Sequence, residues 1–274
     1  MLAIGATRSL RRLRRAFGMG CQHSEYAGVF EKFGDSARNP VTVGRIGIQV
    51  ACDDETGVFL QAATLAEIIE LAKSASARTG RTIGIYPETK HPSYFASIGL
   101  PHEAPLLAML TRFGHVTKDA PIFIQSFEVE NLKALRPKTK LRLIQLMDEK
   151  GSPADRSDLT YPQMATAEGL KIVATYADGV GPNKAMVIPR TLIGNLGTPT
   201  TLVADAHKVG LAVHPWTFRR ENYFLPLVQK SGVDPRGIGD VQAEMKAFLA
   251  TGIDGIFSDN VAEAVSARAN IMGE

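Results

Sequence analysis

The 274-residue sequence contains little cysteine and little net charge, and each scarcity argues against a class of protein. Its two cysteines, Cys21 and Cys52, are far apart and form no Cys-x-x-Cys pair, which argues against a disulfide scaffold and a cysteine-rich zinc site. With so few cysteines, a reducing compartment is the default expectation. The formal net charge of +3 is too small to indicate a nucleic-acid partner.

Long apolar runs are also missing from the sequence. No run approaches the roughly 20 residues that a transmembrane helix needs. The basic run Arg8–Arg15 is followed by no apolar stretch of the kind that a secretory signal requires. The run itself is either a targeting or membrane-surface arm or a solvated tail. As it stands, the chain is therefore expected to be cytoplasmic.

The remaining composition, 45% hydrophobic and 22% charged, is typical of a protein with a packed core. From about residue 60 onward, short apolar runs alternate with helical patterns. The first of these patterns opens with Thr64 and Glu67 at capping-box spacing, and Gly80 can end it. Helices are predicted over 64–80, 104–114, 129–136, 167–177, 199–210, 240–252 and 261–270, and strands over 82–86, 121–127, 141–147, 178–182, 211–216 and 253–259.

Roughly six strand–helix alternations indicate an α/β protein with a parallel sheet. The strands are short apolar runs without polar alternation, as in a sheet covered on both faces. Two architectures suit this pattern, a doubly wound sheet and a (β/α)8 barrel, and in both the chemistry lies at the carboxyl ends of the strands. Polar residues recur at several of these ends, and no glycine-rich phosphate fingerprint follows any strand. Both observations favour the barrel.

Glu88 and Lys90 follow the strand predicted over 82–86. Residues i and i+2 of a strand face the same side, so a carboxylate and an ammonium are expected to share one site. Glu88 can supply an oxygen ligand to a hard divalent cation. Lys90 can hold a phosphate oxygen as a point charge. The alternative is an ordinary surface ion pair past the end of a strand.

Three further residues end predicted strands. The amide of Gln125 can orient a polar ligand. His214 ends an apolar strand, although a lone histidine in such a place is often a structural residue. Trp216 lies two residues further on and can wall the same pocket.

Five segments together carry a family resemblance: IGIYPETKHPSYF, PIFIQSFEVENLKALR, YADGVGPNK, LAVHPWTFRRENYF and FLATGIDGIFSDNVAEAV. In this order they resemble glycerophosphodiester phosphodiesterases of the bacterial periplasmic-type branch, from about Phe59 to the C-terminus. The resemblance implies a (β/α)8 barrel that hydrolyses glycerophosphodiesters to glycerol 3-phosphate and an alcohol. It also implies a divalent cation, calcium or magnesium, two histidines as general acid and base, and often a periplasmic location.

The resemblance assigns roles to residues that match the motifs. Glu88 matches a carboxylate metal ligand, and Lys90 matches a lysine on the substrate side. His214 and Trp216 match pocket residues on the seventh strand, and Gln125 matches a polar position on the fourth. The last four are therefore predicted to bind substrate.

The sequence also departs from the family pattern at its N-terminal end. The family's His-Arg-Gly, Glu-x-Asp and His-Asp strand ends are absent: His23 is followed by serine, and the acidic cluster Asp53–Glu55 follows no convincing strand. We therefore expect an atypical segment over 1–55, possibly disordered, and a barrel domain over 56–274. In that domain the first two βα units are missing or replaced, and no catalytic residue is identified.

This departure has two expected consequences. Open sheet edges favour association, so the chain is expected to be able to form a homo-oligomer. Without the acid and base, little independent hydrolysis is expected, because each such group typically contributes about 10²–10⁴-fold. One alternative is an active metal-dependent diesterase that takes the missing strands from another chain or finds substitutes for them within residues 1–55. The other is an inactive remnant or phosphodiester-binding protein.

Overall fold

The computed structural model describes residues 25–31, 41–48 and 63–272, with side chains described over 63–270. The basic run Arg8–Arg15, both cysteines, His23 and the acidic cluster Asp53–Glu55 lie outside the described residues. The predictions made for them are therefore untested.

Strands and helices alternate along most of the described chain. The strands are β1 (Glu25–Glu31), β2 (Val41–Ile48), β3 (Ile83–Tyr86), β4 (Phe123–Ser126), β5 (Arg142–Met147), β6 (Gly179–Pro182), β7 (Ala212–Val213) and β8 (Gly255–Ser258). The helices are α2 (Leu65–Thr79), α3 (Pro92–Ser97), α4 (Glu103–Arg112), α5 (Val129–Leu135), α6 (Tyr161–Met164), α7 (Ala167–Val173), α8 (Leu202–Lys208), α9 (Val241–Leu249) and α10 (Val261–Met272), with short 3₁₀ turns η1 (Arg136–Lys138), η2 (Lys184–Met186), η3 (Asn222–Phe224) and η4 (Leu227–Gln229).

The helices and strands predicted from residue 64 onward are confirmed in type and order. The capping box of Thr64 and Glu67 begins α2, and Gly80 ends it in the left-handed conformation with φ 68°. Strand β7 is shorter than predicted, but the backbone N–H groups of His214 and Trp216 continue its hydrogen bonding to β6. The short helices α3 and α6 were not predicted; each has a proline in its first turn.

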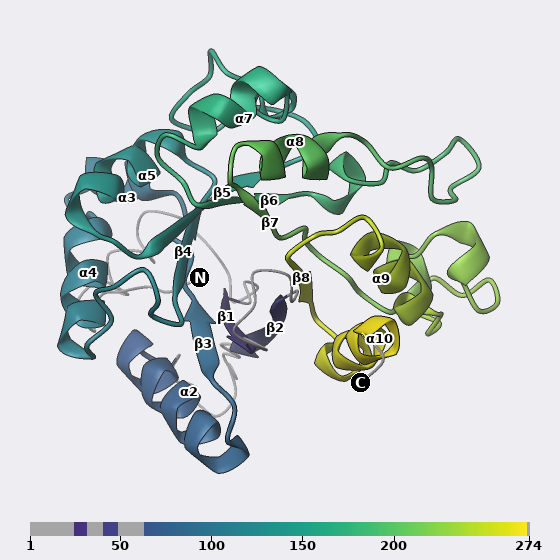
Figure 1. Ribbon diagram of the computed structural model, residues 1–274, viewed down its shortest axis with the longest axis horizontal. Coiled ribbons are helices and arrows are strands. Elements are labelled where there is room, and N and C mark those ends of the chain that lie inside the picture. The colour runs from purple at the N-terminus through teal and green to yellow at the C-terminus, as the bar shows by residue number, and fades with distance from the viewer. Residues whose placement is uncertain (1–24, 32–40, 49–62, 273–274) are drawn as a thin grey trace, which may run out of the picture.

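The strands form two four-stranded sheets, in the orders β3-β1-β2-β8 and β4-β5-β6-β7. Parallel bridges join the sheets at both ends, through Ile85 and Ile122 on one side and Phe218 and Ser258 on the other. Together the sheets close a ring, and Figure 1 shows α2 to α10 arranged around its outside. The predicted α/β barrel is confirmed in this form.

β1 and β2 take the place of the first two strand–helix units. They pair with each other antiparallel, and β1 is also antiparallel to β3, whereas β2 is parallel to β8. The structure describes no helix between them. The expectation of open edges on β3 and β8 is wrong for the described strands, because β1 and β2 pair with those edges.

The core has two parts, one between strands and helices and one inside the ring. The inner cluster consists of Tyr86, Phe123, Ile144 and Phe257, with Trp216 packed against it. Arg142 covers it at the amino-end side, its guanidinium 3.9 Å from the centre of the Phe123 ring. The inside of the ring is thus filled by side chains, as in other small barrels.

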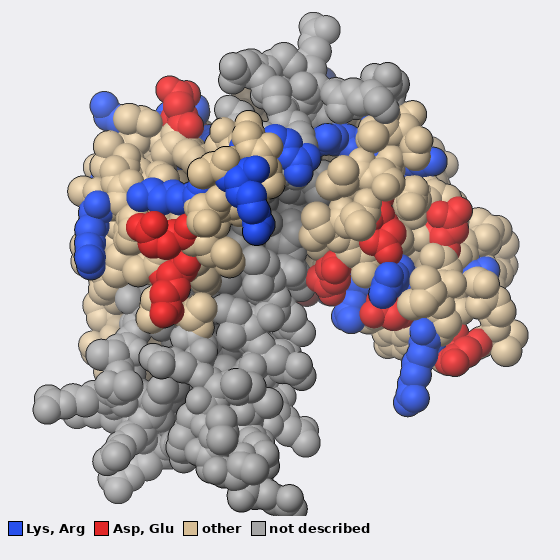
Figure 2. All heavy atoms as spheres, turned by 90° about the horizontal axis from the view of Figure 1, so that it is seen from below, with Lys and Arg blue, Asp and Glu red and all other residues tan. Residues whose placement is uncertain are grey.

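Two surface properties bear on partners. Within the described residues, no helix is both long and apolar enough to cross a membrane. On the face shown in Figure 2, lysine and arginine are interspersed with aspartate and glutamate. The described residues of that face thus carry charges of both signs.

Candidate functional site

The carboxyl ends of the strands form the mouth of the barrel, and the predicted site residues approach it from three strands. Glu88 lies two residues after Tyr86, so strand alternation places both on the inner side. A parallel bridge pairs Glu88, in the segment after β3, with Gln125 of the neighbouring strand β4. The sequence separates these two residues by 37 positions, and the sheet brings them side by side.

Glu88 and Lys90 face each other at this mouth. Lys90 Nζ lies 4.0 Å from Glu88 Oε1, too far for a hydrogen bond. The Glu88 side chain is only 16% exposed, whereas that of Lys90 is 45% exposed. Glu88 Oε1 is buried and has no hydrogen-bond partner among the described residues. This pair therefore retains unused acceptor and donor capacity, unlike a closed surface ion pair.

Two more buried oxygens near Glu88 lack hydrogen-bond partners among the described residues: Gln125 Oε1 and Glu128 Oε1. The other Glu128 oxygen accepts a hydrogen bond of 2.9 Å from the Ser93 backbone and holds the start of α3. Buried acceptors without donors are costly, so such groups commonly mark a place for a ligand, an ion or water.

Trp216 forms the opposite wall of the mouth. Its indole N–H donates to the Gly181 carbonyl at 2.8 Å, and its ring meets Phe127 edge to face with centres 5.7 Å apart. A Cβ atom at Gly181 would lie 2.6 Å from the end of the Leu146 side chain, so a larger residue at this point of β6 would require Leu146 to shift. The indole is thus held in one orientation at the rim.

His214 lies beneath the mouth. It is 1% exposed, and its Nδ1 is 2.9 Å from the Tyr86 hydroxyl. The ring also packs edge-on against Phe123. In this arrangement the His214 side chain offers almost no exposed surface for the predicted contact with substrate. We therefore infer that it supports the mouth from below.

Burial lowers the pKa of His214 to about 4, with a smaller effect of the Arg142 charge in the same direction and an opposing effect of Asp254. Between pH 4 and 6.5 the unfolded chain therefore binds a proton that the folded chain does not, and folding stability falls as the pH falls through that window. We expect this residue to cost about 3 kcal/mol of unfolding free energy between pH 7 and pH 4.

Urea unfolding at pH 7, 6, 5 and 4.5 tests this expectation. The variant His214→Gln keeps a hydrogen-bonding partner for Tyr86 but does not titrate. The difference in unfolding free energy between the two chains should shrink or reverse as the pH falls. A constant difference across the window would show that His214 is not the titrating group.

A buried charge network behind Trp216 was not predicted from the sequence. Glu244 on α9 is 0% exposed and accepts hydrogen bonds from Lys184 Nζ at 2.9 Å and from Arg190 at 2.6 Å. Lys184 is tied to the mouth, because its backbone N–H donates to the Trp216 carbonyl at 2.9 Å. One signal was available: Glu244 falls on the apolar face of its helix with Val241, Met245 and Phe248.

Tyr86 was also missed, although strand alternation placed it directly below Glu88. A further pair, Asn183 and Asp148, joins the ends of β6 and β5 through a hydrogen bond of 3.0 Å. Asn183 directly follows β6, and Asp148 directly follows β5. Polar side chains therefore line the mouth between Trp216 and the β5 end.

The residues present fit a divalent cation only in part. The carboxylate of Glu88 and the amide oxygen of Gln125 are hard oxygen donors of the kind that calcium and magnesium prefer. Across the part of the chain that the structure describes, no group of three or more aspartate, glutamate, histidine or cysteine residues could hold a metal. The described residues thus supply some ligands and not a complete shell.

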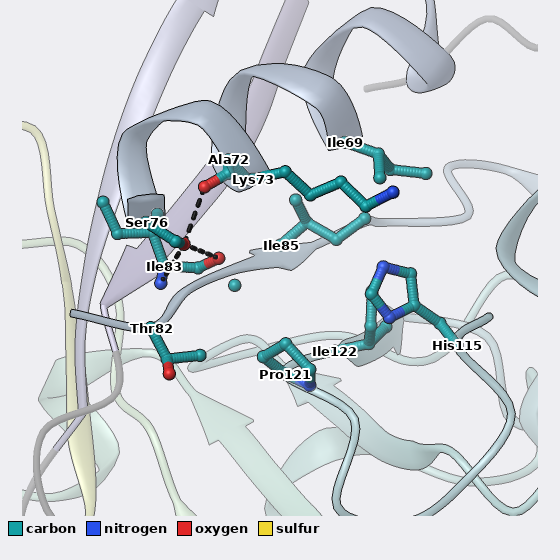
Figure 3. A pocket seen from close by; sticks show the side chains of 11 residues that line it. Ile69, Ala72, Lys73, Ser76, Thr82, Ile83, Ile85, His115, Pro121 and Ile122 are labelled. Atoms are coloured by element: carbon teal, nitrogen blue, oxygen red, sulfur yellow. Dashed lines mark hydrogen bonds between the residues drawn. The ribbon is translucent and has the colours of Figure 1, made fainter. Parts of the chain in front are cut away.

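A separate cavity of about 200 Å³ lies away from these residues, between α2 and β3 (Figure 3). Its lining is mainly aliphatic, and Lys73 and His115 approach it. The Ser76 hydroxyl donates to the Ala72 carbonyl and accepts from the Ile83 backbone, joining helix to strand beside it. We interpret it as a gap in the packing of the helix on the barrel wall.

Comparison with known proteins supports the family resemblance and the barrel fold. The model of the glycerophosphoryl diester phosphodiesterase family matches residues 31–263. The resemblance in the sequence motifs begins at about Phe59, whereas the family match begins further upstream, at residue 31. The domain boundary between residues 55 and 56 therefore stays a prediction.

Two curated relatives and one solved structure illustrate the similarity. Glycerophosphodiester phosphodiesterase GDPD6 of Arabidopsis thaliana is 32% identical over 211 residues, 72% of this chain and 53% of that protein. The glycerophosphodiester phosphodiesterase of Haemophilus influenzae is 26% identical over 213 residues, 72% of this chain and 55% of its own. A putative glycerophosphoryl diester phosphodiesterase of Silicibacter pomeroyi has a TM-score of 0.52 at 18% identity, with 79% of this chain and 60% of that one covered, and it shows the fold alone.

The chain spans about half the length of the curated relatives that it matches. The family match nevertheless covers most of its residues, including the strand ends that carry Glu88, Gln125 and Trp216. This chain belongs to the glycerophosphoryl diester phosphodiesterase family.

Proposed function

We propose that the chain acts on glycerophosphodiesters, hydrolysing them to glycerol 3-phosphate and a free alcohol. One observation carries the proposal: at one mouth, a buried carboxylate oxygen of Glu88 that has no hydrogen-bond partner among the described residues meets the half-exposed ammonium of Lys90. A phosphodiester carries one negative charge, and its oxygens accept hydrogen bonds from an ammonium. The family membership supports the choice of a glycerophosphodiester over other phosphates.

Each mouth residue has a role in this proposal. Lys90 donates to a phosphate oxygen, for which its distance from Glu88 leaves it available. Gln125 Oε1 accepts a hydrogen bond from a substrate hydroxyl and thereby acquires the donor it lacks. Trp216 bounds the pocket and limits how the glycerol or alcohol part can turn.

A divalent cation, calcium or magnesium, would be held by Glu88. When bound, it would neutralise the phosphate charge and assist the attacking water. Because the described residues do not complete its shell, the other ligands would come from substrate, water or residues outside the described set.

Hydrolysis also needs proton transfer. The water that adds to phosphorus loses a proton, and the departing alcohol oxygen gains one. Within the described residues, the strand-end histidine, His214, is buried against Tyr86 and not open to the mouth. This burial favours a second candidate function, binding of the diester without turnover.

One experiment separates the two functions. The chain is incubated with glycerophosphocholine and calcium or magnesium, release of glycerol 3-phosphate is followed, and binding is measured in parallel by calorimetry. Release supports hydrolysis, and binding without release supports the second candidate. Neither binding nor release would show that the mouth is assigned to the wrong ligand.

Substitution of Lys90 tests the phosphate contact. We expect Lys90→Ala to weaken binding of glycerophosphocholine by at least about tenfold, because a hydrogen bond to a charged group contributes roughly 1.5–3 kcal/mol. Titration calorimetry measures the change. Lys138→Ala removes an exposed lysine from the η1 turn and serves as the control. Equal affinities for the two variants would contradict the role of Lys90.

A further inference from the structure

Two loops at the mouth end of the barrel expose aliphatic side chains to solvent. One follows β6 and η2, and the other follows β7, so both leave carboxyl ends of strands. Figure 1 shows them projecting on the side of α8 and α9. Leu192 is fully exposed, Ile193 and Val228 are each 70% exposed, and Leu227 is 53% exposed. We call these four residues the apolar rim.

The apolar rim is held together by hydrogen bonds between the loops. The Leu227 backbone N–H donates to the Gly194 carbonyl at 3.0 Å, and the Val228 N–H donates to Asn195 Oδ1 at 3.2 Å. Arg190, anchored on buried Glu244, also donates to the Phe224 carbonyl at 3.1 Å. These contacts fix the loops, so the aliphatic side chains are held outward and do not collapse onto the core.

The loop that carries Leu227 and Val228 is slightly basic, because residues 217–240 contain four lysine or arginine and three aspartate or glutamate side chains. Residues 191–200 contain no charged side chain. Lys230 and Arg236, in the second loop, form no ion pair with the residues that the structure describes. The neighbouring carboxylates serve the local backbone: Asp234 accepts from the Arg236 N–H, and Asp240 caps α9.

We propose that the apolar rim docks the chain onto an anionic phospholipid surface. Exposed apolar side chains beside cations match the two components of such a surface, its acyl region and its charged headgroups. The choice of lipid over another partner rests on the proposed function, because a phospholipid is itself a phosphodiester of an acylated glycerol and a headgroup alcohol. Docking at the mouth end would bring the site next to such diesters.

Co-sedimentation with vesicles tests the proposal. The probes are vesicles of phosphatidylcholine with phosphatidylglycerol and vesicles of phosphatidylcholine alone. The chain should bind the first more tightly, and added salt should weaken that binding. The double variant Leu192→Ser/Ile193→Ser should bind at least about tenfold more weakly, since each side chain loses much of its transfer free energy. Ile172→Ser, on the exposed face of α7 and 60% exposed, should bind as the unaltered chain does.

Several results would overturn the proposal. One is that the unaltered chain binds neither kind of vesicle. Another is that the double variant Leu192→Ser/Ile193→Ser binds vesicles as tightly as the unaltered chain does. A third is a dimer in size-exclusion chromatography that the rim substitutions dissociate, since the rim would then be a contact between copies. Thermal unfolding checks that the variants fold.

The vesicle assay uses no hydrolysis, so it fails independently of the proposed function. Binding of soluble glycerophosphocholine without vesicle binding would refute the rim alone. Vesicle binding through the rim without any interaction with glycerophosphocholine would refute the proposed function but still support docking through the apolar rim.

Discussion

Replacing Glu244 by alanine should destabilise the protein by about 3–5 kcal/mol, because it leaves the partly buried cations Lys184 and Arg190 without their counter-ion. Burial already lowers the pKa of Lys184, and the Glu244 charge opposes that effect. Without Glu244 the folded state must either hold two uncompensated cations or release a proton from Lys184. Urea unfolding at pH 7 measures the loss.

The same variant should disturb the mouth. Lys184 donates its backbone N–H to Trp216, which is the single tryptophan of the sequence. Tryptophan emission of the folded variant therefore reports directly on the rim of the site. We expect a shifted emission maximum, with Glu244→Gln intermediate because an amide can still accept a hydrogen bond.

The control is Glu130→Ala, which removes an exposed carboxylate paired with Lys133 and Arg156. Exposed pairs of this kind are worth about 0–1 kcal/mol, so its unfolding curve should stay close to that of the unaltered chain. If Glu244→Ala also unfolded like the control, the buried network would contribute no net stability. An unchanged emission maximum in Glu244→Ala would show that the buried charge network does not influence the position of Trp216 at the mouth.

Replacing Glu88 by glutamine should abolish the response of the chain to calcium or magnesium. The substitution keeps the size of the side chain and removes its charge, so a cation held at Glu88, as proposed, would lose that carboxylate ligand. A ligand at 100 times its Kd stabilises a protein by about 2.7 kcal/mol. The unaltered chain should therefore melt several degrees higher with saturating cation, and Glu88→Gln should not.

Hydrolysis of glycerophosphocholine, where the chain shows it, should fall at least about 100-fold in the same variant, since the cation stabilises the developing phosphate charge. Glu149→Gln neutralises an exposed carboxylate near the end of β5 and should keep both the thermal shift and the rate. A calcium-dependent shift retained by Glu88→Gln would place the cation elsewhere.

Much of the fold followed from local sequence signals. Periodic apolar positions and the capping box of Thr64 and Glu67 determined α2, and Gly80 ended it as predicted. The short apolar runs became β3 to β8 in order. These features depend on residues close in the chain, so periodicity and capping chemistry suffice to find them.

The pairing of the N-terminal strands β1 and β2 could not be predicted from such local signals. The pairing of β1 with β3 and of β2 with β8 joins residues up to 214 positions apart. Nothing local in the sequence specifies such partners. The sheet edges that the sequence left open are therefore closed by contacts that only the tertiary structure reveals.

The sequence by itself determined the family, the strand ends and the side shared by Glu88 and Lys90, because motifs and strand alternation are properties of neighbouring residues. The tertiary structure decided which strand ends meet and how deeply each side chain lies. It placed Gln125 beside Glu88, buried His214 against Tyr86, and enclosed Glu244 between two cations. Burial and partner choice arise from packing between distant segments, and that packing separates the open mouth residues from the supporting ones beneath them.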